Sequence, residues 1–293
     1  MLKVQVDVHL DGLICVDKEK FPTDLPRFRF GEFEVSKRVP AEEPVWLKSG
    51  AWYFARGEID VEKGTVANPP SVFEKIDAFI TCFRLFKKGY IAAYPFTFAV
   101  PEEEPPRFAS GYTARSSHGG MVYPLACDEI PRLVEFGDKV YGVISSGPFA
   151  SRNSPGFQFY NRGIEDMGRS DYALAIVDFV SCMEALVSTS RTEISHRLSE
   201  LIALMTEGRP GSRQERYIQC KTLYDKRSRV IHGEKLDDAV KYVNQAEELA
   251  RATTRFCLGY YSVGKGRDDI LMDASNVIFG KTPAFPDFAF SFI

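Results

Sequence analysis

A basic segment between residues 209 and 235 contains the side chains best suited to chemistry. It holds eight basic and three acidic residues, a local charge of +5 in a chain whose formal net charge is −3. Such a segment attracts anions, although a solvated basic helix is the simpler alternative. His232 stands directly before Gly233, a residue type that commonly ends helices. On an ideal helix His232 lies about 60° from Arg229 and about 140° from Arg227. A side chain at an unwinding helix end can swing back toward a neighbour one turn earlier.

The other histidines and cysteines show no spacing typical of a reactive or metal-binding site. No HExxH, P-loop, GxGxxG or GxSxG string occurs, and the six cysteines form no CxxC pair. His9 and His196 fall on polar faces of a predicted strand and a predicted helix, and His118 lies in a glycine-rich loop. We therefore expect no metal and no cofactor. Scattered cysteines in a chain of this length are typical of reduced thiols in a cytoplasmic protein.

Residues 224–233 read YDKRSRVIHG in one-letter code, and this string resembles the signature of HEPN domains, most closely that of the Apea-like branch. Arg227 and His232 match the arginine and the histidine of the family motif, with four residues between them. The stretch from Ala173 to Leu186 resembles the helix that precedes the motif in the family. The resemblance covers about residues 165–265. It implies a bundle of four or five helices with the motif at the end of a middle helix.

Many HEPN proteins are metal-independent endoribonucleases of toxin–antitoxin, anti-phage and RNA-guided defence systems. The resemblance therefore implies cleavage of single-stranded RNA that leaves a 2′,3′-cyclic phosphate. RNA supplies its own nucleophile, the 2′-hydroxyl group. His232 would move the proton, because histidine serves as acid or base at neutral pH, and Arg227 would hold the phosphate with its rigid fork. The residues expected to bind phosphate or support the site are Lys226, Ser228, Arg229 and Glu184.

The resemblance also implies a homodimer, because paired HEPN domains bring two Arg–His sets together and this chain carries one motif. An antitoxin or a trigger ligand could control it. Ser228 departs from the family, in which many active members carry Asn, Asp or His after the arginine. The alternative is a non-catalytic module for dimerisation or RNA binding. In that case Arg227 forms a buried ion pair with Asp225 or Glu184, and His232 only caps its helix.

The elements that must position the motif read as amphipathic helices. Apolar residues at helical spacing predict helices over 171–187, 192–207, 212–232 and 237–261. A capping box at Ser212–Glu215 opens the helix that carries the motif. Together these helices predict an all-α HEPN-like helical bundle over 169–264. A C-terminal helix and tail follow over 265–293, in which the alternating end of the chain is either an added strand or a frayed tail.

The N-terminal part reads mainly as strands. Residues 2–10 alternate in polarity, and Asp11-Gly12 predicts a hairpin that joins them to the apolar run 13–16. Further strands are predicted over 28–35, 52–61 and 90–100, with helices over 71–86 and 128–143. Residues 1–145 therefore form a β-rich α+β domain that could sense a ligand or regulate the bundle. Aromatic residues in 90–96 could bind that ligand, although a sheet core explains them more simply. The turn-rich stretch 146–168 is predicted to be a linker.

Composition is consistent with this α+β organisation. The chain has 293 residues, of which 44% are hydrophobic and 26% are charged, and this is ordinary for two globular domains. The net charge excludes a polycation that would coat nucleic acid along its whole length. The most apolar stretch, 172–187, contains Asp178 and Glu184 and is shorter than the roughly 20 residues of a membrane span. We expect a cytoplasmic protein with no membrane partner.

Overall fold

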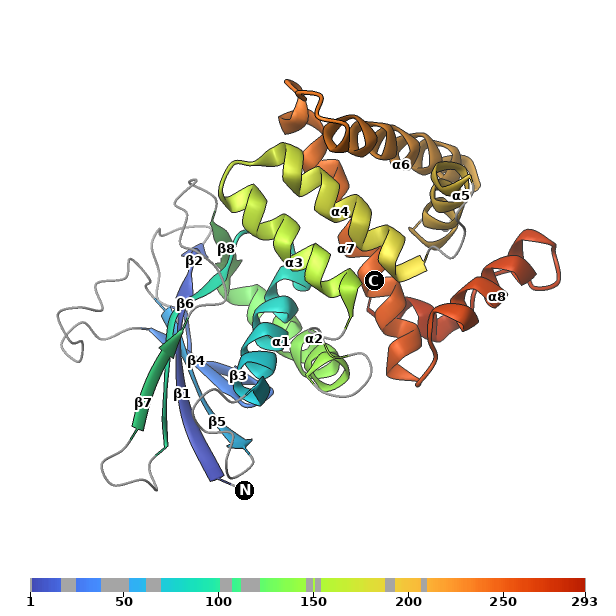
Figure 1. Ribbon diagram of the computed structural model, residues 1–293. Helices are drawn as coiled ribbons and strands as arrows, with labels where there is room; N and C mark the ends of the chain where they lie inside the picture. The colour runs from blue at the N-terminus through green and yellow to red at the C-terminus, as the bar shows by residue number, and fades with distance from the viewer. Residues whose placement is uncertain are drawn as a thin grey trace. The chain divides into compact units, whose positions relative to one another are not determined.

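The computed structural model describes residues 2–16, 25–37, 53–61, 70–100, 107–111, 122–145, 150, 154–187, 193–206 and 210–292. The chain divides into two compact units, Met1–Ser151 and Arg152–Ile293. The first combines an antiparallel sheet with helices, and the second is helical (Figure 1). The α+β layout predicted from the sequence is therefore confirmed.

The N-terminal unit is built on a six-stranded antiparallel sheet in the order β3-β4-β5-β1-β6-β7. Its strands are β1 (Leu2–Asp11), β3 (Phe28–Phe30), β4 (Phe33–Lys37), β5 (Tyr53–Val61), β6 (Ala92–Val100) and β7 (Arg107–Gly111). Val4, Val6 and Val8 of β1 are fully buried, whereas the alternate residues Lys3 and Gln5 are exposed. This period of two places one face of the strand in the core and leaves the other face to solvent.

Two helices, α1 (Pro70–Phe86) and α2 (Ile130–Ile144), complete this unit. A short 3₁₀ turn, Cys127–Glu129, leads into α2. The core between helix and sheet is aromatic: the rings of Phe79 and Phe83 in α1 lie 4.7 and 5.3 Å from that of Phe30. Tyr90 is also buried, so the start of the stretch 90–96 belongs to the core rather than to a ligand site. The side chains of residues 94–96 lie outside the described set.

The predicted hairpin at Asp11-Gly12 is wrong. Strand β2 (Leu13–Val16) does not pair with β1 but pairs in parallel with β8 (Tyr123–Ala126), in a separate two-stranded sheet. The backbone amide of Tyr123 donates to the carbonyl of Gly12 at 2.8 Å, which holds the two strands together just after the bend. The partner of β2 thus lies far along the chain, where a local turn signal cannot indicate it.

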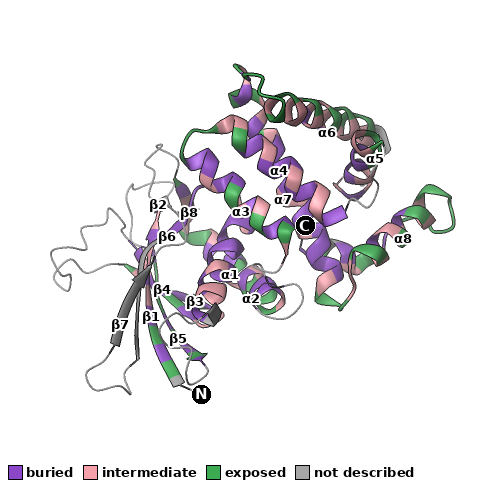
Figure 2. Cartoon of the chain, in the orientation of Figure 1, coloured by how far each residue is buried: buried purple, intermediate pink, exposed green. Residues whose placement is uncertain are grey.

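The C-terminal unit contains six helices within the described residues: α3 (Pro155–Gly168), α4 (Tyr172–Val187), α5 (Ile194–Thr206), α6 (Pro210–Ile231), α7 (Ala239–Ser262) and α8 (Arg267–Ile278). Helix α4 packs against α3, α5, α6, α7 and α8. Its buried residues cover more than half of its circumference, from Cys182 and Ala175 through Phe179 to Val180. This is the pattern of a central helix (Figure 2).

The predicted linker over 146–168 is wrong for most of its length, because residues 155–168 form α3. Glycines in this stretch are packing residues as well as turn signals. A Cβ atom on Gly156 would lie 2.5 Å from Leu186 Cδ2, and one on Gly163 would lie 2.7 Å from Phe179 Cε1. Both glycines therefore let α3 approach α4 closely.

The C-terminal tail forms neither of the two predicted structures. Residues Asp287–Phe290 form a 3₁₀ turn, labelled η4, that packs against α7. The Phe285 ring meets Phe256 edge-on at 4.9 Å, and the Phe288 ring meets Tyr260 edge-on at 5.1 Å. The alternating aromatics thus anchor the tail to a helix instead of pairing with a sheet.

Candidate functional site

The motif segment occupies the last turns of α6 and the bend after it. Helix α6 packs against α4, α5 and α7, so its inner face is determined by three neighbours. Its exposed positions include Ile218, Lys221, Asp225 and Arg229. His232 continues this outward stripe, because seven residues separate it from Asp225, or two turns of helix. Arg227 belongs to another side of the helix.

Arg227 faces α4, where its Nη2 atom donates to Glu184 Oε2 at 3.0 Å. The two side chains are 24% and 19% exposed, so the pair is largely shielded from water. The guanidinium group also lies over the Tyr224 ring, 5.6 Å from its centroid. One carboxylate and one aromatic ring therefore set the orientation of the Arg227 side chain.

Two groups near the Arg227–Glu184 pair have raised pKa values. Burial, followed by the negative charge of Glu184 and a hydrogen bond to it, raises the pKa of Tyr224. Burial also raises the pKa of Cys220 to about 11, against a hydrogen bond with Ser199 and with a contribution from Glu184. Both groups therefore stay protonated at neutral pH. The Nε atom of Arg227 is buried and finds no hydrogen-bond acceptor among the described residues. Such an unsatisfied donor costs about 1–3 kcal/mol.

His232 lies just beyond the last helical residue and is exposed. Its backbone amide donates to the carbonyl of Ser228 at 3.1 Å. The next two amides close the helix end: Gly233 donates to Val230 at 3.0 Å, and Glu234 donates to Arg229 at 3.0 Å. Gly233 has a φ of +84°. This is a Schellman motif, and it requires a residue that adopts the left-handed conformation readily.

The structure does not bring Arg227 and His232 together within one chain. The Schellman motif holds the backbone of His232, while Arg227 is bound to α4, and no hydrogen bond joins their side chains in the described part of the chain. Ser228, between them, is partly buried. The ion pair between Arg227 and Glu184 matches the arrangement expected for the non-catalytic alternative. It equally matches an arginine held in place for a substrate phosphate.

The two remaining basic candidates also have acidic partners. Lys226 lies 2.9 Å from Asp238 Oδ2 and 4.4 Å from the centroid of the Tyr242 ring, and its side chain is only 14% exposed. Arg229 donates through Nε to Glu234 at 2.7 Å, and this pair is exposed. Lys226 therefore ties α6 to the start of α7, and Arg229 reinforces the Schellman motif.

The positive field expected for residues 209–235 is weaker in the folded chain than the local count predicts. Among the described residues of this segment, at least five basic side chains form ion pairs: Arg216 with Glu248, Lys226 with Asp238, Arg227 with Glu184, Arg229 with Glu234, and Lys235 with Asp237. Four of these carboxylates lie outside the counted window. Extending the window by three residues would have found Asp237 and Asp238, but Glu184 and Glu248 reach the segment only through the tertiary fold.

The remaining histidines are not assembled into a comparable site. His196 Nδ1 lies 2.8 Å from the Tyr217 hydroxyl oxygen and is exposed, in agreement with the polar face predicted for it. His118 lies outside the described residues. Within the described ranges no group of three His, Cys, Asp or Glu side chains could hold a metal ion. No helix described here is long and apolar enough to cross a membrane.

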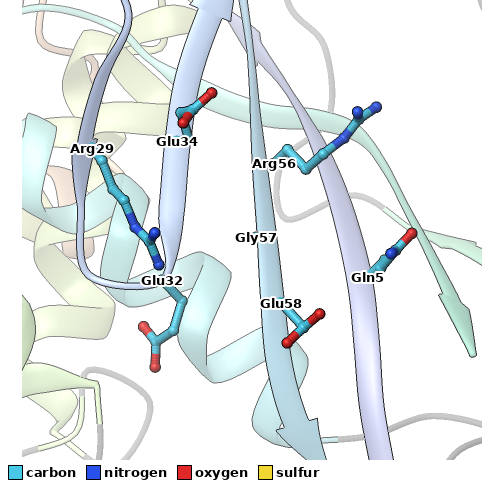
Figure 3. Close-up of a pocket in the computed structure, with 7 residues that line it drawn as sticks. All are labelled: Gln5, Arg29, Glu32, Glu34, Arg56, Gly57 and Glu58. Carbon is cyan, nitrogen blue, oxygen red and sulfur yellow. The ribbon is translucent and has the colours of Figure 1, made fainter.

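A polar hollow of about 280 Å³ lies on the open face of the N-terminal sheet (Figure 3). A row of paired positions crosses four strands there, from Arg29 to Glu34, Arg56 and Asp7. The charges alternate along this row, and Arg56 Nε donates to Asp7 Oδ1 at 2.7 Å. The row therefore compensates its own charge. A hollow of this kind differs from the apolar pocket that a small-molecule sensor would need.

Comparisons of the chain with family models, with curated proteins and with solved structures find no match.

Proposed function

We propose that this chain is a metal-independent endoribonuclease of the HEPN type, with a catalytic site completed by a second copy of the chain. The observation that carries the proposal is the arrangement at the end of α6. An exposed histidine is held there by a Schellman motif, five residues after an arginine that a carboxylate keeps in place. This arrangement supports the proposal, because His232 is accessible to a substrate and the orientation of Arg227 is fixed.

The reaction needs one proton acceptor, one proton donor and a cation. The acceptor takes the proton of the 2′-hydroxyl, whose oxygen attacks the adjacent phosphorus. The 5′-oxygen leaves with a proton from the donor, and a 2′,3′-cyclic phosphate remains. One histidine cannot readily serve both transfers at once, and in one chain Arg227 and His232 point to different sides of α6. Two copies that face each other would supply two histidines and two arginines to one cleft.

The resemblance to HEPN proteins suggests a role in bacterial defence or in a toxin–antitoxin stress response. In that setting the N-terminal unit would sense a trigger or regulate the helical unit. An antitoxin could restrain the ribonuclease activity. Single-stranded RNA is the substrate we propose, since its 2′-hydroxyl can adopt the in-line position for attack.

The test uses the purified full chain with mixed single-stranded RNA in EDTA, beside His232→Ala and the matched control His196→Ala. His196 is also an exposed helix-associated histidine, but it lies on α5 and bonds to Tyr217. We expect the wild type and His196→Ala to leave 2′,3′-cyclic phosphate ends. The rate of His232→Ala should fall by about 10²–10⁴, the usual contribution of a positioned acid–base group.

The second candidate function is a non-catalytic module that dimerises or binds RNA. The observation that favours it is the ion pair of Arg227 with Glu184, which gives the arginine a structural role without any substrate. Under this alternative a folded, dimeric wild type leaves the RNA intact. His232→Ala would then change neither RNA affinity nor the products, and only the stability of the helix end would respond.

A further inference from the structure

The bend that carries His232 joins α6 to α7 (Figure 1). It comprises residues 232–238, with His232 as its first residue, and most of it is exposed. The hydrogen bonds of the Schellman motif hold its start, at Gly233 and Glu234. The position of the His232 imidazole therefore also depends on what holds the far end of the bend.

Asp238 ends the bend and stands at the N-cap position of α7. An aspartate there ordinarily accepts a hydrogen bond from an amide of the first helical turn. The Asp238 side chain makes no such bond to the described first turn of α7. Both of its carboxylate oxygens accept instead from Lys226 Nζ, at 3.2 and 2.9 Å. A residue type suited to capping α7 is thus used to bind α6.

Lys226 makes this contact from α6. Its side chain is only 14% exposed, and its ammonium group lies 4.4 Å from the centroid of the Tyr242 ring. Asp238 and Tyr242 are four residues apart, so they lie on the same side of α7. The hydrogen bond from Lys226 and its positive charge lower the pKa of Asp238, which is therefore ionised at neutral pH. Lys226, Asp238 and Tyr242 together form what we call the α6–α7 clamp.

The neighbouring pair of Asp237 with Lys235 shows how the clamp differs from an ordinary surface pair. Its N–O distance is also 2.9 Å, but its side chains are 79% and 89% exposed. Both residues belong to the bend itself, so their contact joins no two helices. Water screens such a pair, and it contributes little to the position of the chain.

We propose that Asp238 and Tyr242 are positioning residues for His232 and act through Lys226. His232 stands midway in the sequence between Lys226 and Asp238, six residues from each. The clamp therefore closes a loop with His232 at its centre, and the Schellman motif fixes the turn inside that loop. The inference rests on the proposed ribonuclease function, because it assigns these residues to the placement of the acid–base group. A misplacement of about 1 Å can cost such a group about 10²-fold in rate.

The clamp gives Lys226 a different role from the phosphate ligand expected from the sequence. A lysine that binds RNA presents its ammonium group as a point charge, whereas that of Lys226 is enclosed between a carboxylate and an aromatic ring. The two roles predict different effects when Asp238 loses its charge. Release of a clamp residue loosens the bend, whereas release of a phosphate ligand raises the affinity for RNA.

Amide hydrogen exchange of the full chain without RNA tests the hold on the bend. Asp238→Asn keeps the size of the side chain and suits an N-cap position, but it removes the charge that binds Lys226. We expect the amides of Gly233 and Glu234 to exchange about tenfold faster, because the bend then opens without breaking an ion pair. Asp237→Asn, the matched control one residue away, should leave both rates at the wild-type value.

Tyr242→Leu is a second variant in case Asp238→Asn disturbs folding. It keeps an apolar side chain on α7 and removes the ring beside the Lys226 ammonium group, so the same two amides should exchange faster. Amides of α4 should exchange at the wild-type rate in both variants, and an equal acceleration there would mean general destabilisation and overturn the proposal. Wild-type exchange of Gly233 and Glu234 in both variants overturns it as well.

Cleavage of single-stranded RNA in EDTA links the hold on the bend to the proposed chemistry. Asp238→Asn should lower kcat by about 10–100-fold and leave KM unchanged. In a His232→Ala background it should have no further effect, because it acts through that histidine. A lower KM with an unchanged kcat overturns the proposal and assigns Lys226 to phosphate binding. A wild type that cleaves no RNA refutes the proposed ribonuclease, and the exchange rates alone then decide whether the clamp holds the bend.

Discussion

The ion pair between Arg227 and Glu184 should contribute measurably to stability, whereas the neighbouring pair of Arg229 with Glu234 should not. The arginines of the two pairs both lie on α6, and the N–O distances are similar at 3.0 and 2.7 Å. They differ in exposure: the first has side chains 24% and 19% exposed, and the second 47% and 55%. Shielding from water strengthens the attraction between two charges and raises the cost of leaving either one alone.

A double-mutant cycle separates this pairwise contribution from other effects of each substitution. One cycle uses Glu184→Gln, Arg227→Gln and the double variant. The matched cycle uses Glu234→Gln, Arg229→Gln and their double variant. For the shielded pair we expect a coupling free energy of about 1–3 kcal/mol, between the ranges for surface pairs and for fully buried pairs. For the exposed pair we expect a coupling free energy that does not differ measurably from zero, because water screens the two charges.

Urea unfolding of the full chain, followed by its helical circular dichroism, gives the free energy of unfolding for each variant. Coupling energies that are equal within error for the two cycles would refute the reasoning. In that case Glu184 does not hold Arg227, and the claim that a carboxylate positions this arginine fails with it.

Two further measurements follow from the structure. Burial, with the nearby charge of Asp178 and a hydrogen bond to it, raises the pKa of Asp166 from 3.8 to about 6. The folded chain therefore binds this proton more tightly than the unfolded chain, so Asp166 stabilises the fold fully below about pH 4 and loses that contribution as pH rises through 6. The urea midpoint of the wild type minus that of Asp166→Asn should fall from pH 4 to about pH 6 and stay flat from there to pH 8; a constant difference from pH 4 to pH 8 would contradict the shift. Gly233→Ala should destabilise the chain by about 1 kcal/mol through its positive φ alone, since no atom lies within 4 Å of the added Cβ. Gly142→Ala inside α2, where the added Cβ also meets nothing and φ is not positive, should instead stabilise the chain by about 0.5–1 kcal/mol; a loss of stability at both sites would contradict the conformational argument.

The helices and their inner faces could largely be predicted from the sequence. Helix α4 was expected over 171–187 and spans Tyr172–Val187, because its apolar residues specify a buried helix with little dependence on its neighbours. The end of α6 was also predictable, since His232-Gly233 is a strong local stop signal and the Schellman hydrogen bonds are local.

Features that depend on distant partners could not be predicted. The Asp11-Gly12 turn signal is real, but β2 pairs with β8 more than a hundred residues later. Gly156 and Gly163 indicate a linker when taken alone, and only contact with Leu186 and Phe179 of α4 shows why a helix carries them. In each case a local preference is compatible with two structures, and tertiary packing selects one.

The candidate site shows the same limit. The sequence identifies Arg227 and Glu184 as candidates and offers a pair between them as one of two alternatives, and that pair is present. The angle of about 140° between Arg227 and His232 on an ideal helix already indicated different sides of α6. The sequence left open whether the histidine swings back toward an earlier turn, because the path of the chain after the last helical residue decides this.

The ion pairs along α6 change how this surface would respond to salt. A free lysine or arginine that meets RNA releases condensed cations from the phosphates, and affinity then falls steeply as salt rises. Here Arg216, Lys226, Arg227, Arg229 and Lys235 already have carboxylate partners. When a phosphate displaces such a carboxylate, the freed carboxylate takes up a cation from solution. This uptake offsets the cation that the RNA phosphate releases. The helix would thus hold RNA with a shallow dependence on ionic strength, and discrimination between ligands would come from the fit of the phosphate rather than from charge.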